Sequence, residues 1–228
     1  MAVAAAVAAA LVVAAGGVVT ERFETERLSA LDGDARLHAR LDAVCADGRA
    51  IAEQFERTVR RRRFHPFVPA DYEVVRRTLL RLRGPGLRFL EWGSASGIVT
   101  IIADVMGFDA YGIEIDAALV DTARTVAARH GSRARFVSGS FLPSGYEWRT
   151  HDGDTRTGTI ATGESVYAEL GFAPDDFDLV FGYPWAGEAS VMCDVMRRYG
   201  RRDALLLLYG VDGVIRGYRG GREEVGPA

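Results

Sequence analysis

A loop of small residues is the part of this chain best suited to chemistry. Glu91-Trp92-Gly93-Ser94-Ala95-Ser96-Gly97 follows a short apolar run and precedes an apolar helical stretch that starts at Ile98. Small side chains let a bound ligand approach the backbone closely. In open α/β sheets, ligands lie at the carboxyl ends of the strands, and the first strand–helix loop forms the floor of that site. The loop therefore predicts a ligand site.

A second acid, Glu114, ends the next apolar run, in Gly112-Ile113-Glu114-Ile115-Asp116. A carboxylate at the end of the second strand can accept hydrogen bonds from both hydroxyls of a ribose. The alternative interpretation is an exposed charge at a strand end. Asp116 is instead expected to cap the following helix, because Asp is a preferred N-cap residue.

The elements that must position these acids follow from an alternation of short apolar runs and helical stretches after residue 84. This alternation indicates βα units on a parallel sheet. We therefore predict an α/β fold with a doubly wound, mostly parallel sheet and an N-terminal helical extension. The predicted strands span residues 87–91, 110–115, 134–138, 177–181 and 204–208. The predicted helices span 97–106, 117–130 and 187–199, and a shorter helix at about 71–82 precedes the sheet.

Three segments are expected along the chain: an apolar segment at 1–20, a helical extension at 21–83, and the ligand-binding domain at 84–228. In the extension, apolar spacing predicts one helix from Asp34 to about Arg62, after a turn at Asp32-Gly33-Asp34. Within the domain, a connection over about 141–176 is long enough to suggest a lid or a disordered loop. It is expected to end in a short helix near Ser165 to Leu170.

The first 19 residues carry no charged side chain and approach the length of a membrane span. They are mostly alanine, valine and glycine, of which alanine and glycine add little to membrane insertion. A membrane anchor therefore stays open beside a cleaved signal, a disordered extension and a wrongly chosen start codon. We expect a cytoplasmic protein, and an anchor followed by Arg22 and Arg27 would leave the rest of the chain on that side.

The amino-acid composition excludes or disfavours several classes of protein for this chain. All 28 basic residues are arginine, so neither a P-loop lysine nor a pyridoxal phosphate Schiff base is available. The cysteines and histidines are too scattered for a metal site, and we expect no metal. A net charge of -3 gives no overall attraction to nucleic acid. We interpret the dense cluster Arg60–Arg63 as a solvated helix end, so nucleic acid is disfavoured as a partner.

The two acids and the small-residue loop resemble the class I S-adenosylmethionine (SAM)-dependent methyltransferases, whose sheet is Rossmann-like. The resemblance covers about Leu87 to Leu208. In this family an acid is followed by glycines at alternating positions. Here Glu91, Gly93 and Gly97 match, while Ala95 replaces the middle glycine.

The resemblance implies SAM as the cofactor. Gly93, Ser94 and Gly97 would then lie at its methionine half. Glu91 would reach its amino group, directly or through water, and Glu114 would bind the ribose. We therefore expect an enzyme that transfers a methyl group from SAM.

Beyond these positions the chain departs from the family in two ways. Where the family often has an Asp that binds adenine, this chain has Ser140, so adenine would be held by Ser140 and Phe141. Only some twenty residues follow the fifth strand, so the sheet is expected to end at five strands or one more. By the same resemblance, Tyr183, Pro184 and Trp185 stand where the family contacts the methyl acceptor.

The acceptor and the oligomeric state are open from the sequence. Phe64–Pro69 is similar to a segment of membrane-anchored protein-lysine methyltransferases, which makes a protein lysine our first hypothesis, with a small molecule or RNA as alternatives. A non-catalytic methyltransferase-like binding or scaffold module is the rival class. An NAD-dependent oxidoreductase would need G-x-G-x-x-G, but Ala95 and Ile98 fill the second and third glycine positions.

Overall fold

A computed structural model describes residues 16–60, 67–147, 160, 163–185 and 187–224 of the protein. The chain divides into two compact units, residues 1–40 and 41–228. The described residues of the first unit are helical and belong to α2 (Gly16–Phe55). No helix in the described part of the chain is long and apolar enough to cross a membrane. Residues 1–15, most of the expected anchor segment, lie outside the described residues.

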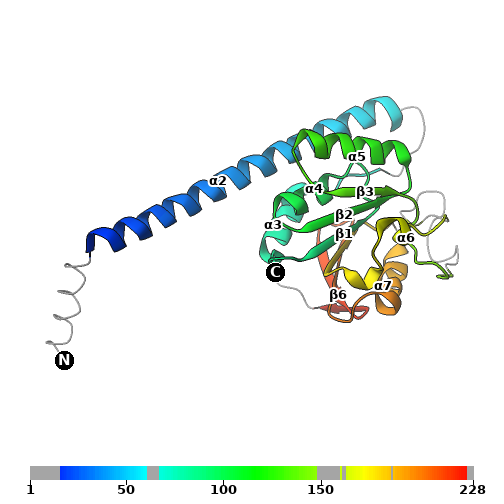
Figure 1. The fold of residues 1–228 in the computed structure, drawn as a ribbon. Helices are drawn as coiled ribbons and strands as arrows, with labels where there is room; N and C mark the ends of the chain where they lie inside the picture. The colour runs from blue at the N-terminus through cyan, green and yellow to red at the C-terminus, as the bar shows by residue number, and fades with distance from the viewer. Residues whose placement is uncertain (1–15, 61–66, 148–159, 161–162, 186, 225–228) are drawn as a thin grey trace. The chain divides into compact units, whose positions relative to one another are not determined.

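The second unit contains a seven-stranded sheet in the order β3-β2-β1-β4-β5-β6-β7 (Figure 1). Strands β1 to β5 pair in parallel, whereas β6 and β7 pair antiparallel. The prediction of a doubly wound, mostly parallel sheet is confirmed. The strands are β1 (Arg88–Trp92), β2 (Asp109–Glu114), β3 (Arg135–Ser138), β4 (Leu179–Gly182), β5 (Leu205–Tyr209), β6 (Ile215–Arg219) and β7 (Arg222–Glu224).

The expectation of five or six strands is wrong, because the sheet continues through β6 and β7. These two strands are short, and their residues are half-buried or exposed. They carry arginine, glycine and glutamate instead of the continuous apolar run of a buried parallel strand. The sequence therefore offered no strand signal after Tyr209.

Helices cover both faces of the sheet (Figure 1). The helices on one face are α3 (Tyr72–Leu82), α4 (Ile98–Val105) and α5 (Ala117–Arg129), and those on the other are α6 (Tyr167–Leu170) and α7 (Glu188–Tyr199). Two further short segments are the π-helix η1 (Glu56–Arg60) and the 3₁₀ helix η3 (Pro174–Asp176). Large side chains from the strands, α6 and α7 form one buried core, with Trp92 and Met192 among them. Helix α6 confirms the short helix that was expected near the end of the long connection.

The turn predicted at Asp32-Gly33-Asp34 is wrong, since α2 runs through these residues. A glycine in a helix interior costs only about 1 kcal/mol relative to alanine, and the flanking Ala, Leu, Arg and Glu residues all favour a helix. In the second unit the end of α2 is held by burial and by ion pairs. Leu41 is fully buried. The carboxylate of Asp47 accepts from Arg129 of α5 at 2.6 Å.

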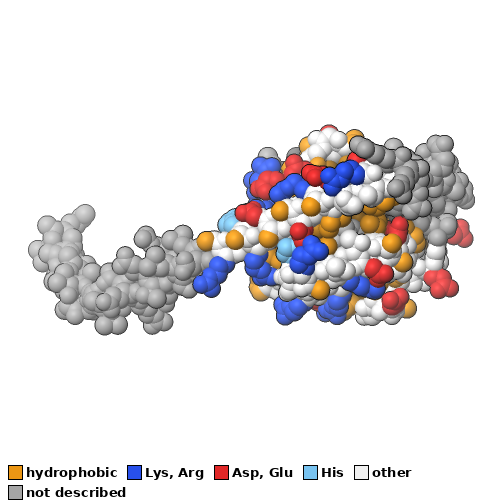
Figure 2. Space-filling view, turned by 90° about the horizontal axis from the view of Figure 1, so that it is seen from above, with side chains coloured by type: hydrophobic (Ala, Val, Ile, Leu, Met, Phe, Trp, Pro, Cys, Tyr) orange, Lys and Arg blue, Asp and Glu red, His pale blue; other side chains and the backbone are white. Residues whose placement is uncertain are grey.

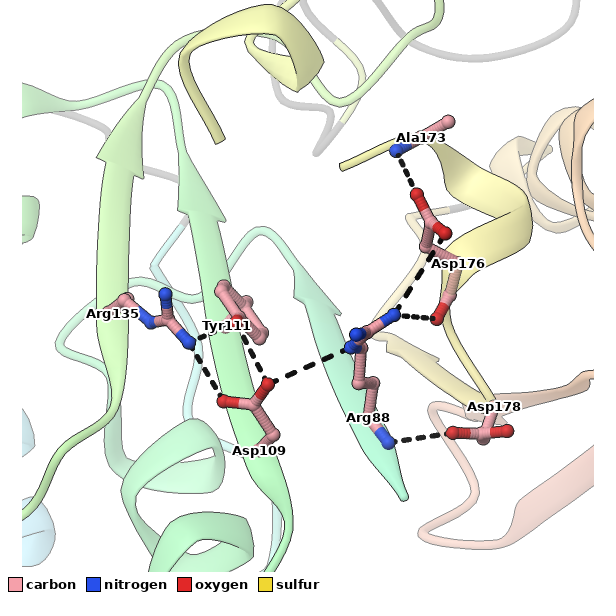
Figure 3. A network of polar contacts seen from close by, with 7 residues as sticks. All are labelled: Arg88, Asp109, Tyr111, Arg135, Ala173, Asp176 and Asp178. Carbon is pink, nitrogen blue, oxygen red and sulfur yellow. Dashed lines mark hydrogen bonds and ion pairs between the residues drawn. The ribbon is translucent and has the colours of Figure 1, made fainter. Parts of the chain in front are cut away.

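Charged side chains join the amino-terminal ends of the strands (Figure 3). Arg88 begins β1 and donates its backbone N–H to Asp178, the residue before β4, at 2.7 Å. Its guanidinium lies 3.7 Å from Asp109 at the start of β2, and Asp109 pairs with Arg135 of β3 at 2.9 Å. Opposite charges thus hold four strands in register at this edge, and the carboxyl-terminal edge is left for a ligand.

Candidate functional site

A pocket with about 350 Å³ of open space lies beside the carboxyl ends of β1 and β4. The direction of winding reverses between these two strands, because β2 follows β1 on one side and β4 adjoins it on the other. Open α/β sheets bind ligands at this point. One wall is the small-residue loop with Glu91, and another is the segment Phe67–Ala70.

The loop adopts a backbone that favours glycine at three places. Gly93, Ala95 and Gly97 have φ values of 73°, 46° and 78°. Ala95 is the position at which the family has its middle glycine, and it takes the left-handed conformation despite its methyl group. This conformation costs a non-glycine residue roughly 1–2 kcal/mol. The chain therefore keeps the shape of the glycine loop at a small energetic cost.

The end of β2 anchors this loop. The backbone N–H groups of Gly93 and Ser94 both donate to the carbonyl oxygen of Ile113, each at 2.9 Å. Ala95 donates its N–H to Oε2 of Glu114 at 2.8 Å. The acid predicted to bind ribose thus also fixes the turn that follows β1.

Two glycines are required by packing. A Cβ on Gly97 would lie 2.7 Å from Ala123 of α5 and from the Phe136 ring of β3. A Cβ on Gly112 would lie 2.8 Å from the side chain of Ser94. The oxygen Oγ of Ser94 is the one buried side-chain polar atom among the described residues without a hydrogen-bond partner. Gly97 therefore lets α4 approach the sheet, and Ser94 keeps an unused donor and acceptor beneath the loop.

Glu91 is a buried acid in the wall of the pocket, only 5% exposed. Its Oε2 accepts the backbone N–H of Thr100 at 2.9 Å and also the Thr100 hydroxyl. Burial raises the pKa of Glu91 to about 8, against the opposing effect of the Thr100 hydrogen bonds. The carboxyl group therefore takes a proton readily when no cation is near.

Glu114 is also buried, and its carboxylate has two backbone partners. Oε2 accepts from Ala95, and Oε1 accepts from the N–H of Asp116 at 2.9 Å. Burial raises the pKa of Glu114, although these backbone hydrogen bonds lower it. Asp116 caps α5 through Ala118, as predicted. Each carboxylate oxygen has two lone pairs, so Glu114 keeps acceptor capacity for a ligand.

The structure places Ser140 and Phe141 directly after β3, outside the lining of the pocket. Phe141 is 3% exposed, and its ring stacks on that of Trp92 with centroids 4.7 Å apart. Ser140 pairs with Ser165, near the end of the long connection. Among the described residues, the pocket brings together Glu91, Gly93 and Ser94, but Gly97, Glu114, Ser140 and Phe141 do not line it.

On the β4 side, the pocket is lined by Tyr183 but not by Pro184 or Trp185. The ring of Tyr183 packs edge-on against Tyr209 at the end of β5, with centroids 4.8 Å apart. Burial raises the pKa of Tyr183, so the phenol stays neutral. Trp185 donates its backbone N–H to the buried carboxylate of Glu188 at 2.8 Å, which fixes the turn.

Sequence reasoning missed the wall made by Phe67–Ala70 and Tyr72. The backbone N–H of Asp71 donates to the Tyr209 hydroxyl at 3.1 Å and so ties this wall to β5. The wall ends at Asp71, which is the N-cap residue of α3. Ile115 was also missed, although an apolar residue that is 45% exposed directly after Glu114 is suited to contact a ligand.

The charge of the pocket is one-sided. Its fourteen lining residues include one carboxylate and neither arginine nor histidine. Elsewhere, acidic and basic side chains are interspersed on the face that Figure 2 shows. A cation that enters the pocket would therefore meet one acid, Glu91, and no competing basic side chain among the described lining residues.

The sheet order, with the site at the carboxyl ends of β1 and β4, is that of a Rossmann-like fold. No protein-family model matches the chain. In sequence the chain is similar to the ribosomal protein L11 methyltransferase of Thermus thermophilus, at 38% identity over 72 residues. The matching stretch is 30% of this chain and only 28% of that relative.

Among solved structures, the chain is similar to an RNA methyltransferase from Salinibacter ruber in complex with S-adenosyl-L-homocysteine. Identity is 20%, covering 62% of this chain and 76% of that one, with a TM-score of 0.45. For the precorrin-6y C5,15-methyltransferase from Geobacter metallireducens, identity is 20%, coverage is 64% and 70%, and the TM-score is 0.43.

Proposed function

We propose that this protein is a SAM-dependent methyltransferase. The buried acid Glu91 carries the proposal, because no basic residue stands beside it among the described lining residues. SAM brings an ammonium and a sulfonium, and a buried carboxylate is stabilised by such a partner. A dinucleotide would bring a pyrophosphate to the same acid, which disfavours the oxidoreductase alternative.

The site residues are assigned by their positions around this pocket. Glu91 binds the amino group of SAM, and the methionine half lies over Gly93 and Ser94. The lone pairs of Glu114 that the backbone leaves unused accept from the ribose hydroxyls. The adenine lies beyond Glu114, towards Ser140 and Ile115.

Methyl transfer in this site needs alignment more than acid–base help. The acceptor attacks the methyl carbon, the carbon–sulfur bond breaks, and the bonding electrons leave with sulfur to give a neutral thioether. An acceptor amine releases its proton to solvent. Because the sulfonium is already activated, holding donor and acceptor in line supplies most of the acceleration.

Isothermal titration calorimetry with SAM, S-adenosylhomocysteine and NAD⁺ tests the cofactor. We expect micromolar or tighter binding of the first two and none of NAD⁺. Changing Glu91 to Gln removes the counter-charge and should weaken both. A folded protein that binds neither sulfur ligand would refute the proposal. Binding without methyl transfer to any acceptor fraction would instead favour the non-catalytic module.

We propose a protein lysine as the acceptor. Three features support this finer assignment: Tyr183 presents an aromatic ring in the pocket, Phe67-Val68-Pro69 lines it, and the Thermus relative is named for a protein acceptor. An aromatic face next to the sulfonium can hold an amine by cation–π attraction. Incubation of cell lysate with methyl-labelled SAM tests the proposal. Label in methyl-lysine after protein hydrolysis is expected, and label confined to RNA or small molecules would refute it.

A further inference from the structure

Among the described residues of the pocket, no cation accompanies the carboxyl group of Glu91. Glu91 is 5% exposed, and its carboxyl group accepts hydrogen bonds from Thr100 of α4. No arginine in the described part of the chain is among the groups that shift the pKa of Glu91. A buried carboxyl that lacks a positive partner is more stable when neutral.

The other described groups that are packed around Glu91 carry no positive charge. From α3 comes the neutral phenol of Tyr72, from β4 the ring of Phe181, and from β2 the carboxylate of Glu114. Glu114 carries negative charge, which further disfavours an ionised Glu91. The two donors of Thr100 act the other way but do not outweigh burial.

We propose that binding of the cofactor expels a proton that Glu91 carries in the empty pocket. This inference rests on the proposed function, because it takes the amino group of SAM as the cation that meets Glu91. On binding, the O–H bond of the carboxylic acid breaks and its electron pair stays on the carboxylate oxygen. The proton passes to the solvent buffer, and the carboxylate forms an ion pair with the ligand ammonium.

The coupling makes affinity depend on pH in a defined direction. Below the pKa that Glu91 has in the empty pocket, each rise of one pH unit increases the ionised fraction of Glu91 about tenfold. The Kd for SAM should therefore fall by about tenfold per pH unit. The slope should hold between about pH 6 and pH 7.5, where the ligand amine is still charged. At pH 7, which lies below the pKa of about 8 that burial gives Glu91, most of one proton should leave per SAM bound.

Calorimetry of SAM binding in buffers of different ionisation enthalpy measures the released proton directly. S-adenosylhomocysteine has the same ammonium and should release the same proton. 5′-Methylthioadenosine lacks the amino acid part and should bind without proton release. SAM binding that is independent of pH and releases no proton would overturn the inference while leaving the proposed function intact, whereas absence of SAM binding would overturn both.

Two variants separate a role of Glu91 from a general effect of pH. Glu91→Gln has no proton to release, and its SAM affinity should be weak and flat with pH. Thr100→Val removes the hydroxyl donor but keeps the backbone one, so it should raise the pH at which the affinity levels off. An unchanged profile in Thr100→Val would overturn the assignment to Glu91.

The empty protein gives a readout that needs no ligand. A carboxyl with a raised pKa in the folded state binds more protons there than in the unfolded chain, so stability falls as the pH rises from about 4.5 towards 8. The melting temperature should therefore fall more steeply in the wild type than in Glu91→Gln over this range. Parallel curves would show that Glu91 is ionised in the empty pocket and would overturn the inference.

Discussion

Gly97 offers the most direct test of the site geometry, through its replacement by alanine. Its φ of 78° costs an alanine roughly 1–2 kcal/mol, which the lower entropy of the unfolded chain partly offsets. The added Cβ would also lie 2.7 Å from Ala123 and Phe136, both buried. Overpacking of this kind costs about 1–3 kcal/mol. We expect Gly97→Ala to lower the free energy of unfolding by about 2–4 kcal/mol.

Gly86→Ala is the matched control. Gly86 has a φ of 70°, but a Cβ there would meet nothing within 4 Å. This variant should therefore lose about 1 kcal/mol or less. Urea denaturation of both variants measures the difference. Equal losses would refute the argument that Gly97 is required by the approach of α4 and α5. Loss of SAM binding by Gly97→Ala without extra destabilisation would assign this glycine to the ligand instead.

Three further substitutions test the loop, the ribose acid and the acceptor turn. Ala95→Gly should relieve the strain of the left-handed conformation and raise the free energy of unfolding by about 0 to 1.5 kcal/mol. A lower free energy of unfolding in urea denaturation would contradict this. Glu114→Ala should cost the empty protein about 1–3 kcal/mol, because two backbone N–H groups lose their acceptor, and should weaken SAM binding in calorimetry; unchanged melting would show that the loop does not depend on it. Trp185→Ala keeps its backbone bond to Glu188, so SAM affinity should hold while labelled methyl transfer falls by roughly tenfold or more, and an equal loss of both would remove the acceptor role.

The sequence predicted best what continuous apolar runs encode. β1 to β5 and the helices α4, α5 and α7 lie within a few residues of their predicted bounds, since buried parallel strands and amphipathic helices carry strong periodic patterns. The acids at the ends of β1 and β2 were found for the same reason. Each ends an apolar run.

What the sequence did not predict depends on tertiary contacts. The wall formed by Phe67–Ala70 is tied through Asp71 to the distant Tyr209 hydroxyl, and this contact cannot be read from the spacing of residues. The dual use of Glu114, as loop anchor and candidate ligand for ribose, cannot be read from spacing alone. The stacking of Phe141 on Trp92 likewise joins residues that are distant in the sequence.

The last strands also bear on how copies of this protein behave in a crowded solution. A sheet edge with unpaired backbone groups can recruit a strand from another molecule and start aggregation. Here β7 has only three residues, Arg222, Glu223 and Glu224, all exposed. Ion pairs across the hairpin, such as that of Arg219 with Glu224 at 2.6 Å, keep charged side chains along this edge. The short, charged β7 therefore makes that edge a poor template for strand addition and favours a protein that stays dispersed at high concentration.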